Sequence, residues 1–119
     1  MAKPLEIRRL ETADGVVIAE RVALARSSMA RFVGLMGRRE LPQGDGIAIH
    51  PCNSIHMFFM LISIDVAFVN GEGRVLHICH SIRPWRVSRI VFGARTAIEL
   101  PAGTLGAKGV ATGTILRLA

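Results

Sequence analysis

From Gly46 to the end of the chain, short apolar runs alternate with turn signals, and this alternation constrains the fold more than any other feature. The runs span four to nine residues, the usual length of β-strands. Turn signals such as Pro51-Cys52-Asn53 and Asn70-Gly71-Glu72-Gly73 separate them. We predict strands over residues 47–50, 55–61, 64–69, 74–82, 94–100 and 114–118, with one helical turn in the glycine-rich stretch 101–109.

The part before Gly46 predicts a hairpin followed by a helix. Residues 5–10 and 16–24 alternate as strands, and Asp14-Gly15 between them is a turn signal. Ser27 or Ser28 can cap a short helix near residues 28–36. Its apolar side chains recur at helical spacing and form one stripe: Met29, Phe32, Val33 and Met36.

These elements predict a mainly β domain of the α+β class, built as a small barrel or a strongly curved sheet with one short helix. The chain has 119 residues, of which 50% are hydrophobic and 20% are charged, a composition far from that of disordered chains. We expect residues 1–119 to form a single domain that folds without disulfide or metal.

Charge and hydropathy limit where the protein can be located and which partners it can bind. The start of the chain, Met1 to Glu6, lacks the apolar core of a secretory signal, and the longest apolar run, Met57 to Ile62, has only six residues. We therefore expect a cytoplasmic protein without a transmembrane segment, exported only if a leader was removed. The net charge of +6 comes mostly from arginine, which favours bidentate contacts with carboxylate or phosphate.

All histidines and cysteines fall into two clusters, His50-x-Cys52 followed by His56, and His77-x-Cys79-His80. Imidazole and thiolate are common ligands of zinc and copper. The spacing nevertheless matches no standard zinc pattern, and two segments would have to meet. We favour the simpler interpretation, in which the cysteines are small buried hydrophobes, and we expect no metal and no cofactor.

A nucleophilic site is a second interpretation of the first cluster. Cys52 lies in a predicted turn, His56 follows closely, and Asp65 or Asn53 could orient the imidazole. Asp65 is a single acid inside an apolar stretch, so it must have partners. It either accepts backbone N–H groups at a bend or acts beside His56, and the sequence does not separate these roles.

The segment from Arg83 to Arg89 surrounds the single tryptophan, Trp85, with three arginines. Guanidinium groups beside an exposed indole suit anion binding or base stacking. In the alternative, which we favour, Trp85 seals one end of the core and the arginines face water.

Several motifs together resemble a known family, the small prokaryotic proteins of domain of unknown function 192. The resemblance covers about residues 21–118 and rests on these segments: residues 31–38 (RFVGLMGR), 46–49 (GIAI), 52–60 (CNSIHMFFM), 64–68 (IDVAF), 84–86 (PWR) and 100–103 (LPAG). It implies the fold and directs attention to family-like positions, but it implies no activity, cofactor or catalytic residue.

The chain departs from the family pattern in two places. Residues 61–63 (LIS) stand where a basic residue and a proline are more usual, and Thr114 replaces a common acid. The second cluster, His77 to His80, is not part of the pattern, which weakens a metal site built from both clusters.

We therefore predict a non-enzymatic binding module for a small anionic ligand or a partner segment. Its candidate ligand-binding residues are Arg31, His56, Met60, Asp65, Trp85 and Arg86. The alternative is a hydrolytic or metal-assisted enzyme with candidate catalytic residues His56, Asp65 and Cys52. Nucleic-acid binding through the Arg83 to Arg89 loop is the weakest hypothesis.

Overall fold

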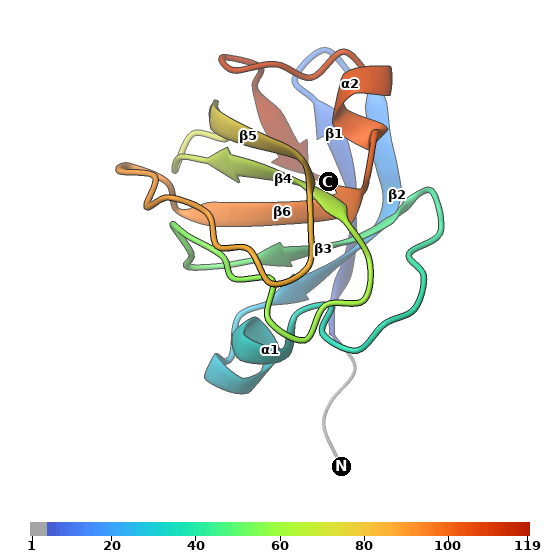
Figure 1. Ribbon diagram of the computed structural model, residues 1–119. Helices are drawn as coiled ribbons and strands as arrows, with labels where there is room; N and C mark the ends of the chain where they lie inside the picture. The colour runs from blue at the N-terminus through green and yellow to red at the C-terminus, as the bar shows by residue number, and fades with distance from the viewer. Residues whose placement is uncertain (1–4) are drawn as a thin grey trace.

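Seven strands form one mixed sheet in residues 5–119, the part of the chain that the computed structural model describes (Figure 1). Their order across the sheet is β5-β4-β6-β3-β2-β1-β7. In chain order the strands are β1 (Ile7–Thr12), β2 (Val17–Ala25), β3 (Asp45–Ile49), β4 (Ile64–Val69), β5 (Val75–Ile82), β6 (Thr96–Pro101) and β7 (Leu116–Leu118). Two short helices complete the fold, α1 (Ser28–Val33) and α2 (Thr104–Ala107). The predicted mainly β architecture is confirmed.

Most pairings are antiparallel, but β2 and β3 run parallel and are joined by a crossover that contains α1. The Ser27 side chain caps α1 by accepting a hydrogen bond from Ala30 N at 3.1 Å. The helix ends at Gly34, which adopts φ 48°, so it is shorter than the predicted 28–36. Its apolar stripe is largely exposed, with Met29 at 70% and Phe32 at 62%.

One predicted strand, over residues 55–61, is absent. This segment is a loop that pairs only through an isolated bridge between His56 and Val87. The chain turns at Met57–Met60, where Phe59 has φ 63° and Met60 N donates to Met57 O. Met57 and Met60 are buried inside this turn while Phe58 and Phe59 point outward, a spacing of three residues that differs from the alternation of a strand. The continuous apolar run from Met57 to Ile62 hides this difference in the sequence.

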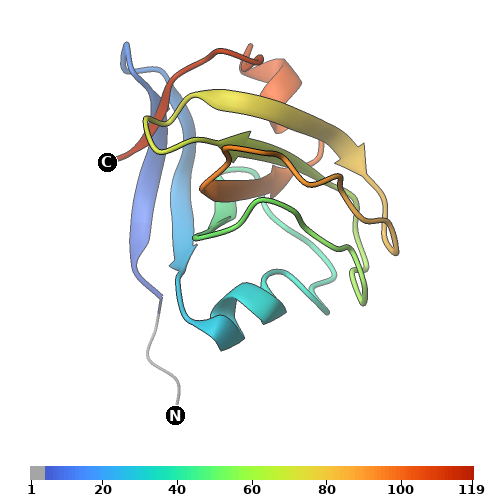
Figure 2. The same cartoon turned by 90° about the vertical axis from the view of Figure 1, so that its left-hand side faces the viewer.

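The sheet is strongly curved and is not closed into a barrel (Figure 2). The ends of β5 and β7 approach one another at a single bridge, Arg74 to Ile115. Val75 N donates to Thr114 O beside this bridge, at 2.9 Å. Of the two predicted forms, the curved sheet is therefore correct.

The two faces of the curved sheet bury separate apolar clusters. Strand β4 divides its side chains between them, because alternate residues point to opposite faces: Ala67 and Val69 join one cluster, Val66 and Phe68 the other. The first cluster lies inside the curve and includes Leu105 of α2. The second lies under the turn after α1, the 55–60 loop and the 91–94 segment. This second face holds the candidate site.

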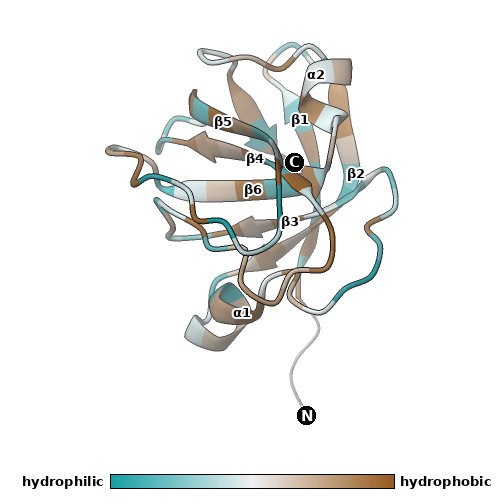
Figure 3. Ribbon diagram, in the orientation of Figure 1, coloured by the Kyte–Doolittle hydropathy of each residue, from teal (hydrophilic) through white to brown (hydrophobic). Residues whose placement is uncertain are grey.

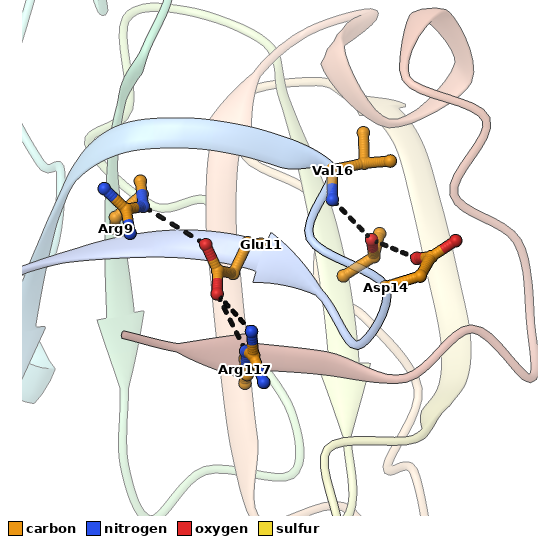
Figure 4. A network of polar contacts seen from close by, with 6 residues as sticks. Arg9, Glu11, Asp14, Val16 and Arg117 are labelled. Atoms are coloured by element: carbon orange, nitrogen blue, oxygen red, sulfur yellow. Dashed lines mark hydrogen bonds and ion pairs between the residues drawn. The ribbon is translucent and has the colours of Figure 1, made fainter.

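Ion pairs stabilise the edge of the sheet that β1 and β7 form (Figure 4). Glu11 on β1 is buried and accepts hydrogen bonds from Arg117 Nε at 2.8 Å and from Arg9 Nε at 3.2 Å. The hydrogen bond with Arg117 is the main reason that the pKa of Glu11 is lowered. No helix in residues 5–119 is long and apolar enough to cross a membrane.

Candidate functional site

A cavity of about 290 Å³ lies between α1, the segment after β3 and the central strand β6. The segment after β3 begins with a cis His50–Pro51 peptide bond. Apolar side chains dominate the lining. Four residues in it have side chains that can bind a ligand or transfer a proton: Arg31, Cys52, His56 and Glu99. The volume suits a small molecule better than a folded segment of another protein.

Glu99 enters the cavity because of strand alternation in β6. Its register partners are Ile47 on β3 and Val66 on β4, both members of the apolar cluster on the same face. The carboxyl is therefore buried at a position that otherwise calls for an apolar side chain. Burial raises the pKa of Glu99 from 4.5 to about 7, because desolvation disfavours the charged form.

Gly34 gives the Glu99 carboxyl its space at the end of α1. A Cβ built on Gly34 would lie 3.6 Å from Glu99 Oε1 and 3.7 Å from Ile49 Cδ1. Any side chain here would take up room beside the carboxyl, and φ 48° also favours glycine.

Arg31 comes from the last turn of α1 and reaches the same cavity. Its Nη1 donates to Pro51 O at 3.1 Å, which ties the helix to the segment after β3. Its Nε is buried and is the single buried side-chain nitrogen or oxygen in residues 5–119 without a hydrogen-bond partner. A buried donor without an acceptor lowers stability, so Arg31 Nε–H is available to a ligand that brings a hydrogen-bond acceptor.

Cys52 and His56 also line the cavity, and each has a local hydrogen bond. The Cys52 thiol donates to Ser54 O at 3.0 Å. Burial is the largest cause that raises the pKa of Cys52, Glu99 raises it further, and Ser54 and Arg31 oppose the shift. His56 accepts the Phe58 N–H through Nδ1 at 3.2 Å. This geometry holds the imidazole in place but leaves the thiol unactivated.

Three of the predicted ligand-binding residues, Arg31, His56 and Met60, line the cavity together. Asp65 does not join them. It is fully buried on the opposite face of the sheet, where its two carboxylate oxygens accept from Ser81 N at 2.9 Å and Leu105 N at 3.0 Å. The grouping of His56, Asp65 and Cys52 that an enzyme would need is therefore not formed.

Trp85 and Arg86 lie outside the cavity on the neighbouring loop. The backbone of both is fastened to Met57, since Trp85 N donates to Met57 O at 2.8 Å and Met57 N donates to Arg86 O at 2.7 Å. The Trp85 side chain is 59% exposed, so the favoured interpretation, in which it seals the core, is wrong.

The histidines outside the cavity have local contacts. His50 Nδ1 lies 2.8 Å from Thr96 Oγ1, and His77 stacks on Phe68 with ring centroids 6.2 Å apart. Burial lowers the pKa of His77 and raises the pKa of Cys79. Within residues 5–119, no three histidine, cysteine or acidic side chains are grouped as a metal site requires.

Sequence reasoning missed Glu99, although a signal was present. Glu99 is an acid between Ile98 and Leu100 in an apolar strand, the same pattern that singled out Asp65. Which of the two acids faces a cavity depends on the register of the sheet, and that is a tertiary property.

Comparison with known proteins gives consistent results. Residues 9–118 match DUF192, described as an uncharacterised family. A UPF0127 protein of Thermococcus sibiricus is 38% identical over 96 residues, covering 76% of this chain and 61% of that protein. This chain thus matches about three-fifths of that relative's length. The UPF0127 protein PF1050 of Pyrococcus furiosus is 31% identical over 109 residues, covering 87% of this chain and 91% of that protein.

Solved structures share the fold along almost the whole chain. A crystal structure from Sinorhizobium meliloti 1021, provisionally described as a transcription regulator, has a TM-score of 0.83 at 26% identity. The alignment covers 99% of this chain and 98% of that one. A protein of unknown function from Novosphingobium aromaticivorans has a TM-score of 0.81 at 23% identity, covering 98% of this chain and 93% of that one.

Proposed function

This chain belongs to the DUF192 family, and we propose that it is a non-enzymatic binding module for a small anionic ligand. The ligand occupies the cavity beneath α1 and combines one acidic group with a short apolar body. The observation that carries this proposal is Arg31 Nε, a buried donor without a partner in a cavity that is otherwise mostly apolar.

Glu99 defines the chemistry of the ligand further. With a pKa of about 7, its carboxyl is protonated in mildly acidic solution and can donate a hydrogen bond. A carboxylate ligand can then accept from both Arg31 Nε and the Glu99 hydroxyl. Above about pH 7 Glu99 ionises, and its charge repels the ligand. Binding therefore weakens as the pH rises through 7.

The apolar lining accounts for the body of the ligand. Ile49, Ile55, Met60, Leu35 and Phe32 surround the cavity and offer only dispersion contacts. A straight alkyl chain fills such a space, and each buried methylene contributes about 0.8 kcal/mol. We therefore expect affinity to increase along a series of straight-chain carboxylates until the cavity is filled.

Isothermal titration calorimetry with acetate, butyrate, hexanoate and phosphate tests the proposal. We expect saturable binding that is tightest for hexanoate and that weakens above pH 7. Arg31→Gln removes the charged donor and should lower affinity about tenfold or more. Arg31→Lys keeps the charge but loses the guanidinium geometry, so an intermediate loss is expected.

Arg26→Gln is the matched control, because Arg26 is exposed and does not line the cavity. It removes the same charge and should leave the affinity unchanged. If Arg26→Gln and Arg31→Gln reduce binding equally, the effect is a general one of net charge, and the proposed site is wrong. Absence of carboxylate binding by the folded wild-type protein would also contradict the proposal.

We further propose that the module works in the cytoplasm. Cys52 and Cys79 are free thiols in this structure. A reducing compartment preserves such thiols, whereas an oxidising one exposes them to disulfide formation. Fractionation of cells that produce the full-length protein tests the location, and recovery in the secreted fraction would contradict it.

A further inference from the structure

A line of exposed rings runs across three segments of the chain beside the cavity. Phe32 on α1 lies 5.9 Å from His56, His56 lies 5.1 Å from Phe58, and Trp85 lies 5.9 Å from Phe58 and 5.0 Å from Phe59, all between ring centroids. We call these five residues the aromatic surface. Phe32, Phe59 and Trp85 are each about 60% exposed, at 62%, 61% and 59%.

The loops that carry these rings are joined by their backbones into one body. Beyond the contacts of Met57, Ser88 N donates to Ile55 O at 2.9 Å and Val91 N donates to Asn53 O at 2.8 Å. Gly37 N donates to Phe59 O at 3.0 Å, which connects the turn after α1. In Figure 2 the two loops, green and orange, extend on the side away from β1 and β2. The rings are thus displayed by a fixed framework.

Two of the exposed rings belong to residues whose backbone conformation is unfavourable. Phe59 has φ 63° and Trp85 has φ 68°, in the left-handed region that bulky side chains rarely adopt. The cost of this conformation is not recovered by burying these two side chains, since both are more than half exposed. Contact with something outside the molecule would recover it.

Positive charge predominates around the aromatic surface. Residues 26–39, 46–64 and 83–98, which supply it and its surroundings, contain eight arginines and no aspartate or glutamate, although the exposed Glu40 and the buried Glu99 follow two of these segments directly. The four ion pairs in residues 5–119 all use other arginines: Arg8, Arg9, Arg21 and Arg117. The arginines of the three acid-free segments therefore have no acidic partner within the described chain, and they match an anionic surface.

We propose that the aromatic surface docks the protein on an anionic lipid bilayer. The loop of Trp85 carries exposed aliphatic and aromatic side chains without hydrogen-bonding groups, Val87 at 63%, Ile90 at 56% and Phe92 at 88%. In Figure 3 the backbone of this loop, after β5, shows both hydrophobic and hydrophilic stretches. Its exposed apolar side chains gain free energy on entering hydrocarbon, while the arginines attract lipid phosphates. A bilayer also adapts to separate loop tips, whereas a nucleic acid offers the aliphatic groups little.

Trp85 is the single tryptophan, so its fluorescence reports directly on this surface. The full-length protein is titrated with vesicles of phosphatidylcholine and with vesicles of phosphatidylcholine mixed with phosphatidylglycerol. We expect a blue shift of the emission, and quenching by brominated acyl chains, with the anionic vesicles only. Arg86→Gln should lower the partition coefficient about fivefold, and binding should weaken as salt is added.

Matched controls separate docking from general charge and general hydrophobicity. Phe59→Asn removes an exposed ring and suits the positive φ, so it should fold and bind vesicles poorly. Ile7→Ser changes a residue on β1 with 54% exposure, and Arg8→Gln removes a charge on the same strand. Both control variants should bind like the wild type, with co-sedimentation as the second measurement.

Two results would overturn the proposal. The first is the absence of binding to anionic vesicles at low salt, including the case in which the protein binds single-stranded DNA or an acidic peptide instead. The second is an equal loss in Arg86→Gln and Arg8→Gln, which would assign binding to net charge alone. The two proposals share Phe32 and His56, which line the cavity, but Phe59 and Arg86, which the vesicle test changes, do not line it. Either proposal can therefore fail alone.

Discussion

Single residues with unusual environments carry most of the functional argument. Arg31 has a buried donor without an acceptor, and Glu99 has a carboxyl buried in an apolar face. Neither is explained by stability, because each costs free energy in the unliganded protein. Residues that lower stability at a cavity are typical of binding sites.

The buried carboxyl of Glu99 makes stability depend on pH. The unfolded chain ionises near pH 4.5 and the folded protein near pH 7, so the unfolded state loses its proton first. The contribution of Glu99 to stability is therefore most favourable below pH 4.5, becomes less favourable as the pH rises to about 7, and is then constant. Glu99→Gln should remove this pH-dependent loss and raise the free energy of unfolding at about pH 8 by up to about 3 kcal/mol.

Urea denaturation at several pH values measures this effect. Glu20→Gln is the control, since Glu20 is an exposed acid on β2 and its substitution should leave the slope unchanged. If the stability difference between the wild type and Glu99→Gln does not change between pH 5 and 8, within about 0.5 kcal/mol, the buried state of Glu99 is contradicted.

The thiols give a second prediction at this scale. Burial raises the pKa of both Cys52 and Cys79, so both remain protonated near neutral pH. Because the thiolate is the reactive form, iodoacetamide should modify each more slowly than it modifies the free amino acid. Mass spectrometry of timed samples measures the rates. Selective, rapid labelling of Cys52 would instead revive the nucleophile hypothesis.

At the scale of elements, sequence patterns within a few residues predicted the strands and turns whose formation depends on neighbouring residues. The β4 strand and the Asn70–Gly73 turn lie where the sequence indicates, since alternation and turn residues act within a few positions. The prediction of a strand over 55–61 was wrong because a continuous apolar run does not distinguish a strand from a turn that buries Met57 and Met60. Arg31, His56 and Met60 were predicted as ligand-binding residues and line the cavity, whereas the placement of Glu99 depends on pairing with distant strands.

Asp65 illustrates how one side chain joins three elements. From β4 it accepts the backbone N–H of Ser81 on β5 and of Leu105 on α2. Asp65→Ala leaves one buried and one partly buried donor unpaired and should reduce the free energy of unfolding by roughly 2–4 kcal/mol. Asp45→Ala is the control. It removes an exposed ion pair with Arg21 and should lower the free energy of unfolding by less than about 1 kcal/mol.

Urea denaturation of both variants near neutral pH compares these values. Asp65 would have a functional rather than a structural role if Asp65→Ala were as stable as Asp45→Ala but lost ligand binding.

At the scale of the whole molecule, charge and apolar surface are distributed unevenly. The ion pairs fasten the side of β1, β2 and β7, while the acid-free segments place arginines and exposed rings around the cavity. The curved sheet separates these two sides, and the pairing of its strands determines the position of each side (Figure 1). One side of the molecule thus serves stability, and the other is available for binding.

The central claim is that the cavity beneath α1 binds a small anion through Arg31. The most direct test is an NMR titration of hexanoate that follows the Arg31 Nε–H signal, assigned by its loss in Arg31→Lys. We predict a saturable shift of this signal below pH 7 that weakens as Glu99 ionises. If the signal stays unchanged while hexanoate saturates another part of the protein, or if hexanoate does not bind at all, the claim is wrong.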